Sequence, residues 1–362
     1  MAAMFTVKAV ANNAPAVSAH AAVLMEAGSG GVVYEKNADE RMLIASTTKI
    51  MTALVVLENC SPDEVIVIDP AWTGVEGSSM YLKAGQELTI EELLYGLLLA
   101  SGNDAALALA CITAGTVENF AVLMNEKAAE LGCENTHFEN PHGLDSEEHY
   151  SSARDLAMIA RAALENDLFR AIVSTQSKTV EEQTYVNHNR LLRECDGVFG
   201  VKTGYTAAAG RTLVTCCERN GLTFICVTLS APDDWDDHKS LYDWAYELWM
   251  NFTVLNENDK WTIPVVGGAA EKVCVAPAED LSIFCRRGEE VTLSIHLPSF
   301  VYAEVLAGES AGVAVASLEG KETISVPIIF CESVEKTEED DSLWRKLEDI
   351  FRISERNIYT LS

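Results

Sequence analysis

The hydrophobic pattern of this chain changes its period twice, and these changes constrain the fold more than any other feature. Apolar residues recur with a helical period in several segments between residues 46 and 164. From residue 197 to 230 the pattern alternates, and residues 253–334 hold short β-prone runs with almost no helical period. We therefore expect a first domain that combines helices with strands, followed by a small all-β domain.

Turn and capping residues indicate where several elements begin and end. The β-prone runs 21–26 and 32–35 are separated by a Gly-Ser-Gly-Gly turn and predict a hairpin, and Asn220-Gly221 predicts another. Thr89 and Glu92 have the spacing of a capping box. We expect helices that begin near Ser46, near Thr89 with a break at Gly102, and over residues 104–114, 117–131, 152–164 and 237–249.

Length and charge limit the domain number and the partners. The chain has 362 residues, of which 55 are acidic and 26 basic, and the net charge of −29 excludes nucleic acid as a partner. No apolar run reaches the roughly 18 residues of a membrane-spanning helix. The expected parts are a leader remnant at 1–19, a first domain at 20–252, an all-β domain at 253–334, and a charged linker with an amphipathic helix at 335–362.

The cysteines and histidines show no metal-binding spacing. Ten cysteines occur without a C-x-x-C pair, and the seven histidines do not form H-E-x-x-H. We expect the cysteines to be buried free thiols that serve as small apolar side chains. In the register of the second hairpin, Cys226 faces Thr215 rather than Cys216 or Cys217, which argues against a disulfide there.

Ser46 and Lys49 form an S-x-x-K pair at the start of the first long helix. Helical residues three apart have Cβ atoms about 5–6 Å apart, so the lysine can reach the serine hydroxyl. A partly buried lysine loses proton affinity, and its free amine can then take the serine proton. The pair alone is a weak signal, because a serine N-cap followed by a solvated lysine gives the same letters.

Ser101-Gly102-Asn103 interrupts two apolar helices. The triplet can be read as a glycine that ends one helix and an asparagine that caps the next. It can also be read as a tight loop that presents a hydroxyl and an amide, which could relay a proton and hold a lysine or a substrate amide. Neither reading is decided by the triplet itself.

Lys202-Thr203-Gly204 lies on the strand that opens the β region. A glycine here allows a substrate to lie along the strand like an added edge, with the lysine and threonine offered to a carboxylate. The alternative without a binding role is a pair of ordinary strand residues beside a glycine bulge. This motif, too, is close to chance when it is taken alone.

Taken together and in this order, the three motifs are the signature of class A β-lactamases and penicillin-binding proteins. The sequence resembles the D-alanyl-D-alanine carboxypeptidases, the low-molecular-mass penicillin-binding proteins, over essentially its whole length. S-G-N in place of S-D-N favours the carboxypeptidases over the β-lactamases. Further segments that look like this family are residues 34–38, 44–52, 140–144, 149–157, 187–192 and 209–211.

The resemblance implies a fold and a set of roles. The fold would be an antiparallel sheet covered by helices on both faces, with a helical subdomain at about 48–193 inserted between its first and later strands. Ser46 would be the acyl-forming nucleophile and Lys49 its general base. Ser101 would shuttle the proton toward the leaving group, and Asn103 would hold Lys49 and the substrate amide. No metal and no organic cofactor is implied.

The resemblance also implies how the substrate is held. Lys202 and Thr203 would bind the terminal carboxylate, with Gly204 leaving room for the substrate. The oxyanion hole would be the backbone N–H groups of Ser46 and Tyr205. Many relatives carry an arginine for the carboxylate in a segment that here reads Pro-Asp-Asp-Trp-Asp-Asp-His; Arg211 could replace it, or could simply pair with a carboxylate. His142 and His149 are expected to pack in loops.

The implied activity is that of a serine-type D-Ala-D-Ala carboxypeptidase outside the cell membrane. Its substrate would be the peptidoglycan stem pentapeptide, and β-lactams would acylate the same serine. The amphipathic helix at the C-terminal end could touch the membrane surface or dock onto a domain. The alternatives are a β-lactamase, an endopeptidase that cuts cross-linked peptides, and a penicillin-binding scaffold with vestigial turnover.

Overall fold

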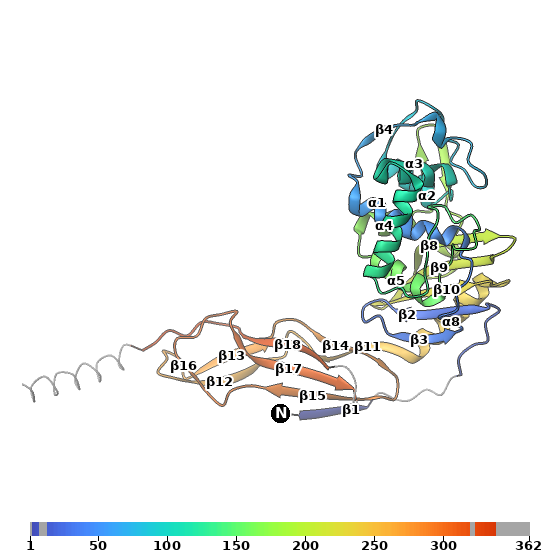
Figure 1. Cartoon of the computed structure of the whole chain (residues 1–362). Coiled ribbons are helices and arrows are strands. Elements are labelled where there is room, and N and C mark those ends of the chain that lie inside the picture. Colours follow the sequence, from blue (N-terminus) through green and yellow to red (C-terminus); the bar gives the residue numbers. More distant parts are fainter. Residues whose placement is uncertain (1, 7–12, 319–322, 338–362) are drawn as a thin grey trace, which may run out of the picture. The chain divides into compact units, whose positions relative to one another are not determined.

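The computed structural model describes residues 2–6, 13–318 and 323–337 (Figure 1). The chain divides into two compact units, one formed by residues 12–247 and the other by residues 1–11 together with 248–362. Strand β11 (Trp249–Leu255) pairs with β14 (Leu281–Arg286), so the second unit begins several residues before the boundary expected near 253.

A five-stranded antiparallel sheet forms the centre of the first unit, in the order β3-β2-β10-β9-β8. Both predicted hairpins are present, and Cys226 faces Thr215 as expected. The strand bounds are β2 Ala21–Glu26, β3 Val32–Lys36, β8 Val198–Thr206, β9 Gly210–Arg219 and β10 Leu222–Leu229.

Helices and short hairpins occupy the chain between β3 and β8, as the resemblance implied. The capping box of α2 is present, with Thr89 and Glu92 each bound to the other's backbone N–H. Helix α6 was not predicted, and it begins at an N-cap formed by Asn166. The elements are η1 Ala45–Thr48, α1 Lys49–Asn59, β4 Val65–Val67, η2 Pro70–Trp72, β5 Glu87–Thr89, α2 Ile90–Leu98, α3 Asn103–Ala114, α4 Val117–Glu130, α5 Ala153–Ala163, α6 Asp167–Ser174, β6 Ser177–Val180, β7 Gln183–Val186 and α7 Leu191–Glu194.

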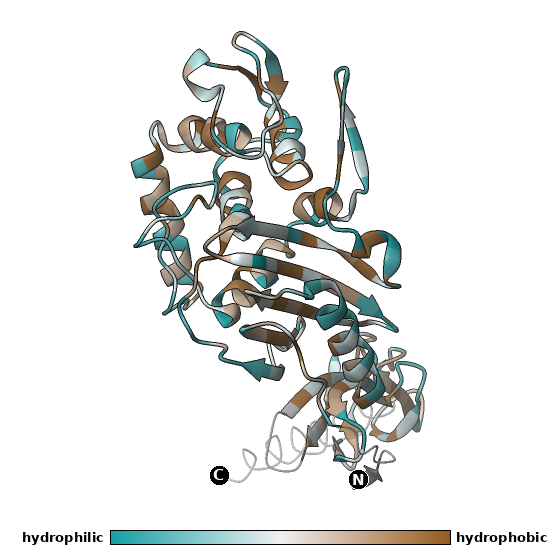
Figure 2. Ribbon diagram, turned by 90° about the vertical axis from the view of Figure 1, so that its right-hand side faces the viewer, coloured by the Kyte–Doolittle hydropathy of each residue, from teal (hydrophilic) through white to brown (hydrophobic). Residues whose placement is uncertain are grey.

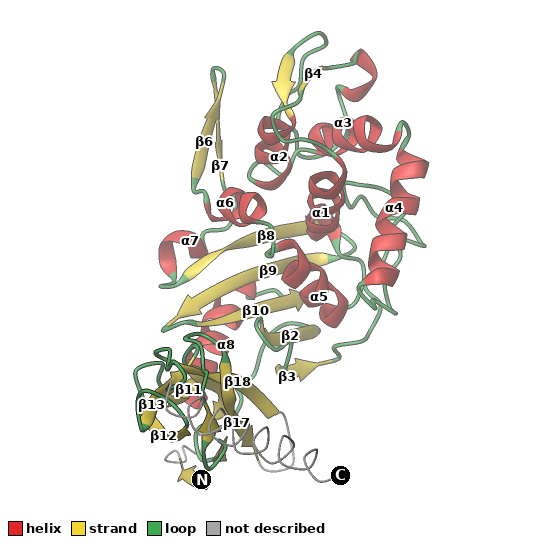
Figure 3. Ribbon diagram, turned by 90° about the vertical axis from the view of Figure 1, so that its left-hand side faces the viewer, coloured by secondary structure: helices red, strands yellow, loops and turns green. Residues whose placement is uncertain are grey.

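Helices cover the sheet on both faces (Figure 3). On one face α5 packs against β2 and β10, and its buried residues join those of α1 to α4 in a single apolar core. On the other face α8 (Asp234–Leu248) contributes His238 and Tyr242, which hydrogen-bond to Thr215 of β9. Figure 2 shows the same division, with hydrophobic colouring on the central strands and on the core-facing helices.

Helix α8 begins at Asp234, three residues before the expected start at Asp237. The earlier start is favourable because carboxylates in a first turn are stabilised by the helix N-terminus. The two carboxylates also have specific partners. Asp234 is paired with Arg211, and Asp237 accepts hydrogen bonds from the backbone N–H groups of Ser18 and Ala19.

The second unit is built from strands, as the β pattern predicted. Seven strands form a sheet in the order β1-β15-β17-β18-β13-β12-β16, and β11 with β14 forms a separate pair whose β14 contacts β17 and β18. Strand β1, Ala2–Thr6, lies within the expected leader and pairs with β15. The other bounds are β12 Trp261–Val266, β13 Lys272–Pro277, β15 Glu290–His296, β16 Val301–Tyr302, β17 Ser310–Leu318 and β18 Thr323–Phe330.

Two expectations concern membranes. Among the described residues no single helix is long and apolar enough to cross a bilayer; α3 and α4 pass this test only as a pair, and they meet at an angle of 84°. The amphipathic helix expected within residues 335–362 lies outside the part of the chain that the structure describes.

Candidate active site

Ser46 lies in the short helix η1, and Lys49 is the first residue of α1. The serine is half-buried and the lysine is fully buried. Lys49 Nζ is 3.0 Å from Ser46 Oγ, 2.7 Å from Asn103 Oδ1 and 2.6 Å from the backbone oxygen of His142. The S-x-x-K spacing therefore forms the contact that the sequence predicted, and the lysine also has two acceptors from distant segments.

The surroundings of Lys49 favour a neutral amine. Burial first, and then the positive charge of Lys202, lower the pKa of Lys49 well below its ordinary value, while Asp104 acts in the opposite direction. A neutral amine has two N–H groups and one lone pair. In that form the oxygens of Asn103 and His142, which can only accept, take the two N–H groups and leave the lone pair for the hydroxyl of Ser46; an ammonium would instead donate to all three oxygens.

The loop between α2 and α3 holds Ser101 and Asn103, both almost completely buried. Ser101 has a positive φ of 59°, which tightens the turn. The backbone N–H of Asn103 donates to the oxygen of Ser78 at 2.7 Å, and its Nδ2 donates to the oxygen of Glu76 at 2.6 Å. These bonds fix the side-chain oxygen of Asn103 toward Lys49.

A loop at residues 76–82, which the sequence analysis did not single out, lines this side of the site. It is held by the buried carboxylate of Asp104, which accepts hydrogen bonds from the backbone N–H groups of Met80 and Leu82 and from the hydroxyl of Ser79. Asp104 follows Asn103 directly, so one turn of α3 positions both the loop and the amide that contacts Lys49.

The edge strand β8 carries the third motif against η1. A Cβ atom on Gly204 would overlap Thr212 Oγ1 of β9 and would lie 3.0 Å from the backbone nitrogen of Ser46 and 3.2 Å from Cβ of Ala45, so a larger residue would clash with β9 and crowd η1. Lys202 is fully buried, its Nζ donates to the backbone oxygen of Thr203 at 2.8 Å, and burial lowers its pKa to about 7. Tyr205 is exposed.

Arg211 lies on β9 opposite Tyr205, on the face of the sheet that α8 covers. Its guanidinium donates to the buried carboxylate of Asp234, with Nε at 3.0 Å and one Nη at 2.9 Å from the same oxygen. The ring of Trp235 lies 5.4 Å from this guanidinium and 5.1 Å from that of Arg190. The structure therefore shows the pairing with a carboxylate, and Arg211 is not among the residues that contact Lys49.

Comparisons with known proteins agree with this geometry. The family model described as D-alanyl-D-alanine carboxypeptidase matches residues 8–233. The chain belongs to this family. It is 32% identical to the D-alanyl-D-alanine carboxypeptidase DacF of Bacillus subtilis, over 88% of this chain and 86% of the relative, and 34% identical to DacC of Escherichia coli, over 89% and 86%.

Solved structures agree with the sequence relatives. Penicillin-binding protein 5 of Haemophilus influenzae aligns with a TM-score of 0.69 at 29% identity, covering 90% of this chain and all of that one. The DD-transpeptidase of Streptomyces K15 aligns with a TM-score of 0.63 at 35% identity, covering 66% of this chain and all of that one. The mixed α+β fold with an antiparallel sheet is thus the fold of low-molecular-mass penicillin-binding proteins.

His149 supports the turn at Ser46 from the loop side, beside the segment of the family pattern at 140–144. The backbone N–H of Glu139 donates to Nδ1 at 3.1 Å, so Nε2 carries the proton and donates to Thr48 Oγ1 at 2.8 Å. Thr48 in turn donates to the backbone oxygen of Ala45 at 2.8 Å. Ala45 has a positive φ of 46°, so this chain of bonds stabilises a strained turn next to Ser46.

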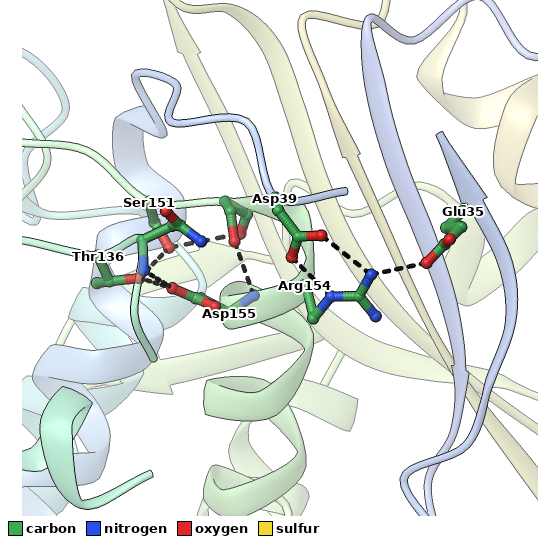
Figure 4. A network of polar contacts seen from close by, with 8 residues as sticks. Glu35, Asp39, Thr136, Ser151, Arg154 and Asp155 are labelled. Atoms are coloured by element: carbon green, nitrogen blue, oxygen red, sulfur yellow. Dashed lines mark hydrogen bonds and ion pairs between the residues drawn. The ribbon is translucent and has the colours of Figure 1, made fainter. Parts of the chain in front are cut away.

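Two polar side chains at the start of α5 bind the segments near Asp39 and near Thr136 (Figure 4). Arg154 bridges Glu35 of β3 and Asp39 with N–O distances of 2.7 Å. Asp155 accepts from the hydroxyl of Thr136 at 2.7 Å and from the backbone N–H of Asn135 at 2.8 Å. The segment that leads to η1 and the loop that leads to His142 are therefore both anchored to one helix N-terminus.

The structure contains the predicted contacts of the site and adds others that the sequence did not predict. Ser46, Lys49, Asn103 and Gly204 come together as expected. The sequence did not reveal the carboxylate of Asp104, nor two contributions made by backbone atoms, namely the oxygens of His142 and Glu76. Such backbone contacts do not depend on a particular side chain and so leave no motif. The structure shows no group of three or more His, Cys, Asp or Glu residues that could hold a metal, within the residues it describes.

We predict that His149→Gln reduces the loss of folding stability at acid pH. Burial, followed by the charges of His137 and Lys49, lowers the pKa of His149 to about 4 from 6.5. The unfolded chain then binds the proton that the folded chain refuses, so stability present above pH 6.5 is lost as the pH falls toward 4. Glutamine keeps a hydrogen-bond acceptor and a donor but does not titrate. The variant should therefore lose about 2–3 kcal/mol less folding stability than the wild type as the pH falls.

The measurement is urea unfolding at pH 7.5 and 4.5, followed by far-UV circular dichroism. The matched control is His20→Gln, because His20 is exposed and pairs with Glu40 at the surface. This control should keep the wild-type pH dependence. Equal losses of stability in wild type and His149→Gln would contradict the role given to His149.

Proposed function

We propose that this chain is a serine-type D-Ala-D-Ala carboxypeptidase that removes the terminal D-alanine from peptidoglycan stem pentapeptides through an acyl-enzyme at Ser46. The observation that carries the proposal is the fully buried Lys49, whose Nζ lies 3.0 Å from Ser46 Oγ while two carbonyl oxygens take its N–H groups. Membership of the D-alanyl-D-alanine carboxypeptidase family supports the same conclusion.

In the acylation step, Lys49 acts as general base. Its lone pair takes the proton of the Ser46 hydroxyl while Oγ attacks the carbonyl carbon of the penultimate D-alanine. The backbone N–H groups of Ser46 and Tyr205 stabilise the oxyanion, and the approach of Gly204 to the Ser46 nitrogen supports this assignment. Ser101 passes the proton on to the nitrogen of the leaving D-alanine, and water then hydrolyses the ester.

Lys202 and Thr203 bind the terminal carboxylate of the substrate in this proposal, and Asn103 positions both Lys49 and the substrate amide. Arg211 is proposed as a further cation for the carboxylate. The ion pair with Asp234 uses Nε and one Nη, and a guanidinium has five N–H donors. Asp234 would then act by holding Arg211 at the end of β9 near Tyr205.

Peptidoglycan lies outside the cytoplasmic membrane, so the enzyme is proposed to work there. An export leader at residues 1–19 and contact of the C-terminal segment 335–362 with the membrane surface belong to the same proposal. So do the assignment of residues 20–252 to catalysis and that of 253–334 to a separate all-β domain. β-Lactams should acylate Ser46, because they present a reactive amide and a carboxylate to the same groups.

In the deciding experiment the protein is incubated with benzylpenicillin and, separately, with a D-Ala-D-Ala-terminated peptide. We expect a covalent penicilloyl adduct on Ser46 by peptide mass mapping, and release of free D-alanine from the peptide. Absence of the adduct would refute the mechanism. An adduct without D-alanine release would indicate a scaffold with vestigial turnover, and rapid hydrolysis of the penicillin would indicate a β-lactamase.

A second prediction concerns the base. Lys49→Ala and Lys49→Met should each slow acylation by penicillin by about 10²–10⁴-fold, because the serine loses its proton acceptor. Methionine keeps most of the volume and so separates loss of the base from loss of packing. Lys49→Arg should be equally slow, since a guanidinium stays charged and cannot take the proton. Lys83→Ala, at an exposed lysine, is the control.

Stopped-flow acylation and far-UV circular dichroism of each variant give the two readouts. A Lys49→Arg variant that is acylated as fast as wild type would rule out proton abstraction by this side chain.

A third prediction concerns the cation. The pKa of Lys202 is lowered to about 7 by burial, so kcat/KM for D-alanine release should fall as the pH rises above this value and the ammonium is lost. The peptide is N-acetylated so that only the enzyme titrates. Lys202→Arg, which remains charged, should lose this alkaline fall. A wild-type profile that stays flat from pH 7 to 10 would contradict a carboxylate-binding role for Lys202.

A further inference from the structure

Two cysteines of the second unit face each other near its surface. Strands β13 and β18 pair antiparallel with Val275 opposite Phe330, so the next residues outward, Cys274 and Cys331, are opposite as well. The backbone N–H of Cys331 donates to the backbone oxygen of Cys274 at 2.9 Å, which confirms that the register continues. These two residues are 57 positions apart in the chain, so the sequence alone gave no reason to pair them.

The spacing of such a pair suits a disulfide. Directly opposite residues of an antiparallel pair have Cα atoms about 5.5 Å apart when they are hydrogen-bonded, within the range of about 4.4–6.8 Å that disulfides require. Side chains of directly opposite residues in an antiparallel pair project from the same face of the two strands, so both thiols lie on the same side. In agreement with this placement, burial and then the Cys274 thiol raise the pKa of Cys331.

Exposure separates this pair from the other cysteines that lie close together. Cys216, Cys217 and Cys226 are fully buried in the first unit. By contrast, Cys331 is exposed and Cys274 is half-buried, with Val273 and Val275 on either side of it directed into the core. An oxidant in solution can therefore reach Cys331 without unfolding the sheet.

We propose that Cys274 and Cys331 form a disulfide when the protein meets a thiol–disulfide oxidant. The thiolate of Cys331 attacks a small disulfide such as oxidised glutathione, and one glutathione thiol leaves. The Cys274 thiolate then attacks the mixed disulfide, releases the second glutathione thiol and closes the bond. Two protons and two electrons pass from the protein to the oxidant, which ends as two thiols.

The bond would join β13 to the chain that directly follows β18. It would close the segment 274–331, which contains β14 to β18. A cross-link over a segment of this length restricts the unfolded chain and so stabilises the folded one. Disulfides persist in oxidising extracytoplasmic surroundings, so the bond fits the proposed location, but its chemistry is independent of the proposed catalytic activity.

The test uses the full chain in its native state, equilibrated with a glutathione redox buffer and then alkylated. Digestion without reduction should yield one linked peptide pair, which contains Cys274 and Cys331. Each of the other eight cysteines should appear in an unlinked, alkylated peptide, for the buried ones only after denaturation. The melting temperature of the oxidised protein should exceed that of the reduced protein by at least about 5 °C in the transition of the second unit.

Variants separate this bond from other thiol chemistry. Cys274→Ser and Cys331→Ser should each abolish both the linked peptide and the redox-dependent shift in melting temperature. Cys60→Ser, at another half-buried cysteine, should keep both. The proposal would be overturned if Cys274 and Cys331 both remain alkylatable in the oxidised native protein, or if they carry separate glutathione adducts without a link. Neither readout depends on carboxypeptidase activity, and the linked peptide of the wild-type protein does not depend on any variant.

Discussion

The buried amine of Lys49 is the group on which the rest of the site depends. An amine with no exposure to water needs a hydrogen-bond partner for each N–H group and for its lone pair, because an unsatisfied polar group in a protein interior costs about 1–3 kcal/mol. Here those partners come from η1, from the first turn of α3 and from the loop at His142. Three segments that are distant in sequence must therefore meet within hydrogen-bonding distance of one nitrogen before the core can close.

Much of the surrounding architecture serves to bring those segments together. Gly204 allows β8 to lie against the backbone of Ser46 and beside Thr212 of β9, and a side chain there would clash with Thr212 and crowd the Ser46 nitrogen. Asp104 fixes the loop that orients Asn103, and Asp155 fixes the loop that leads to His142. Each anchor is a carboxylate near the N-terminus of a helix, where the helix dipole favours its charge, so a strongly acidic chain uses its acidic residues to place a basic group.

The parts of this structure that follow from local rules could be predicted, and the parts that depend on distant backbone atoms could not. The Asn-Gly turn set the register that places Cys226 opposite Thr215, and the S-x-x-K spacing placed Lys49 beside Ser46. By contrast, Lys49 and Asn103 are also held by backbone carbonyl oxygens, which every residue type has, so no sequence pattern marks them. Cys274 and Cys331 required the pairing of β13 with β18, which alternation along either strand does not specify.

In the proposed mechanism the two buried lysines have different roles, Lys49 as base and Lys202 as cation, and they cannot both be charged at low cost. Burial and then the positive charge of Lys202 lower the pKa of Lys49, and burial lowers that of Lys202 to about 7. A substrate carboxylate beside Lys202 favours its ammonium form and so raises its pKa, and a fully charged Lys202 in turn favours the neutral amine of Lys49. In this mechanism, binding of that anion would increase the fraction of Lys49 that is neutral and able to take the Ser46 proton, so a peptide with a free terminal carboxylate would gain reactivity as well as affinity.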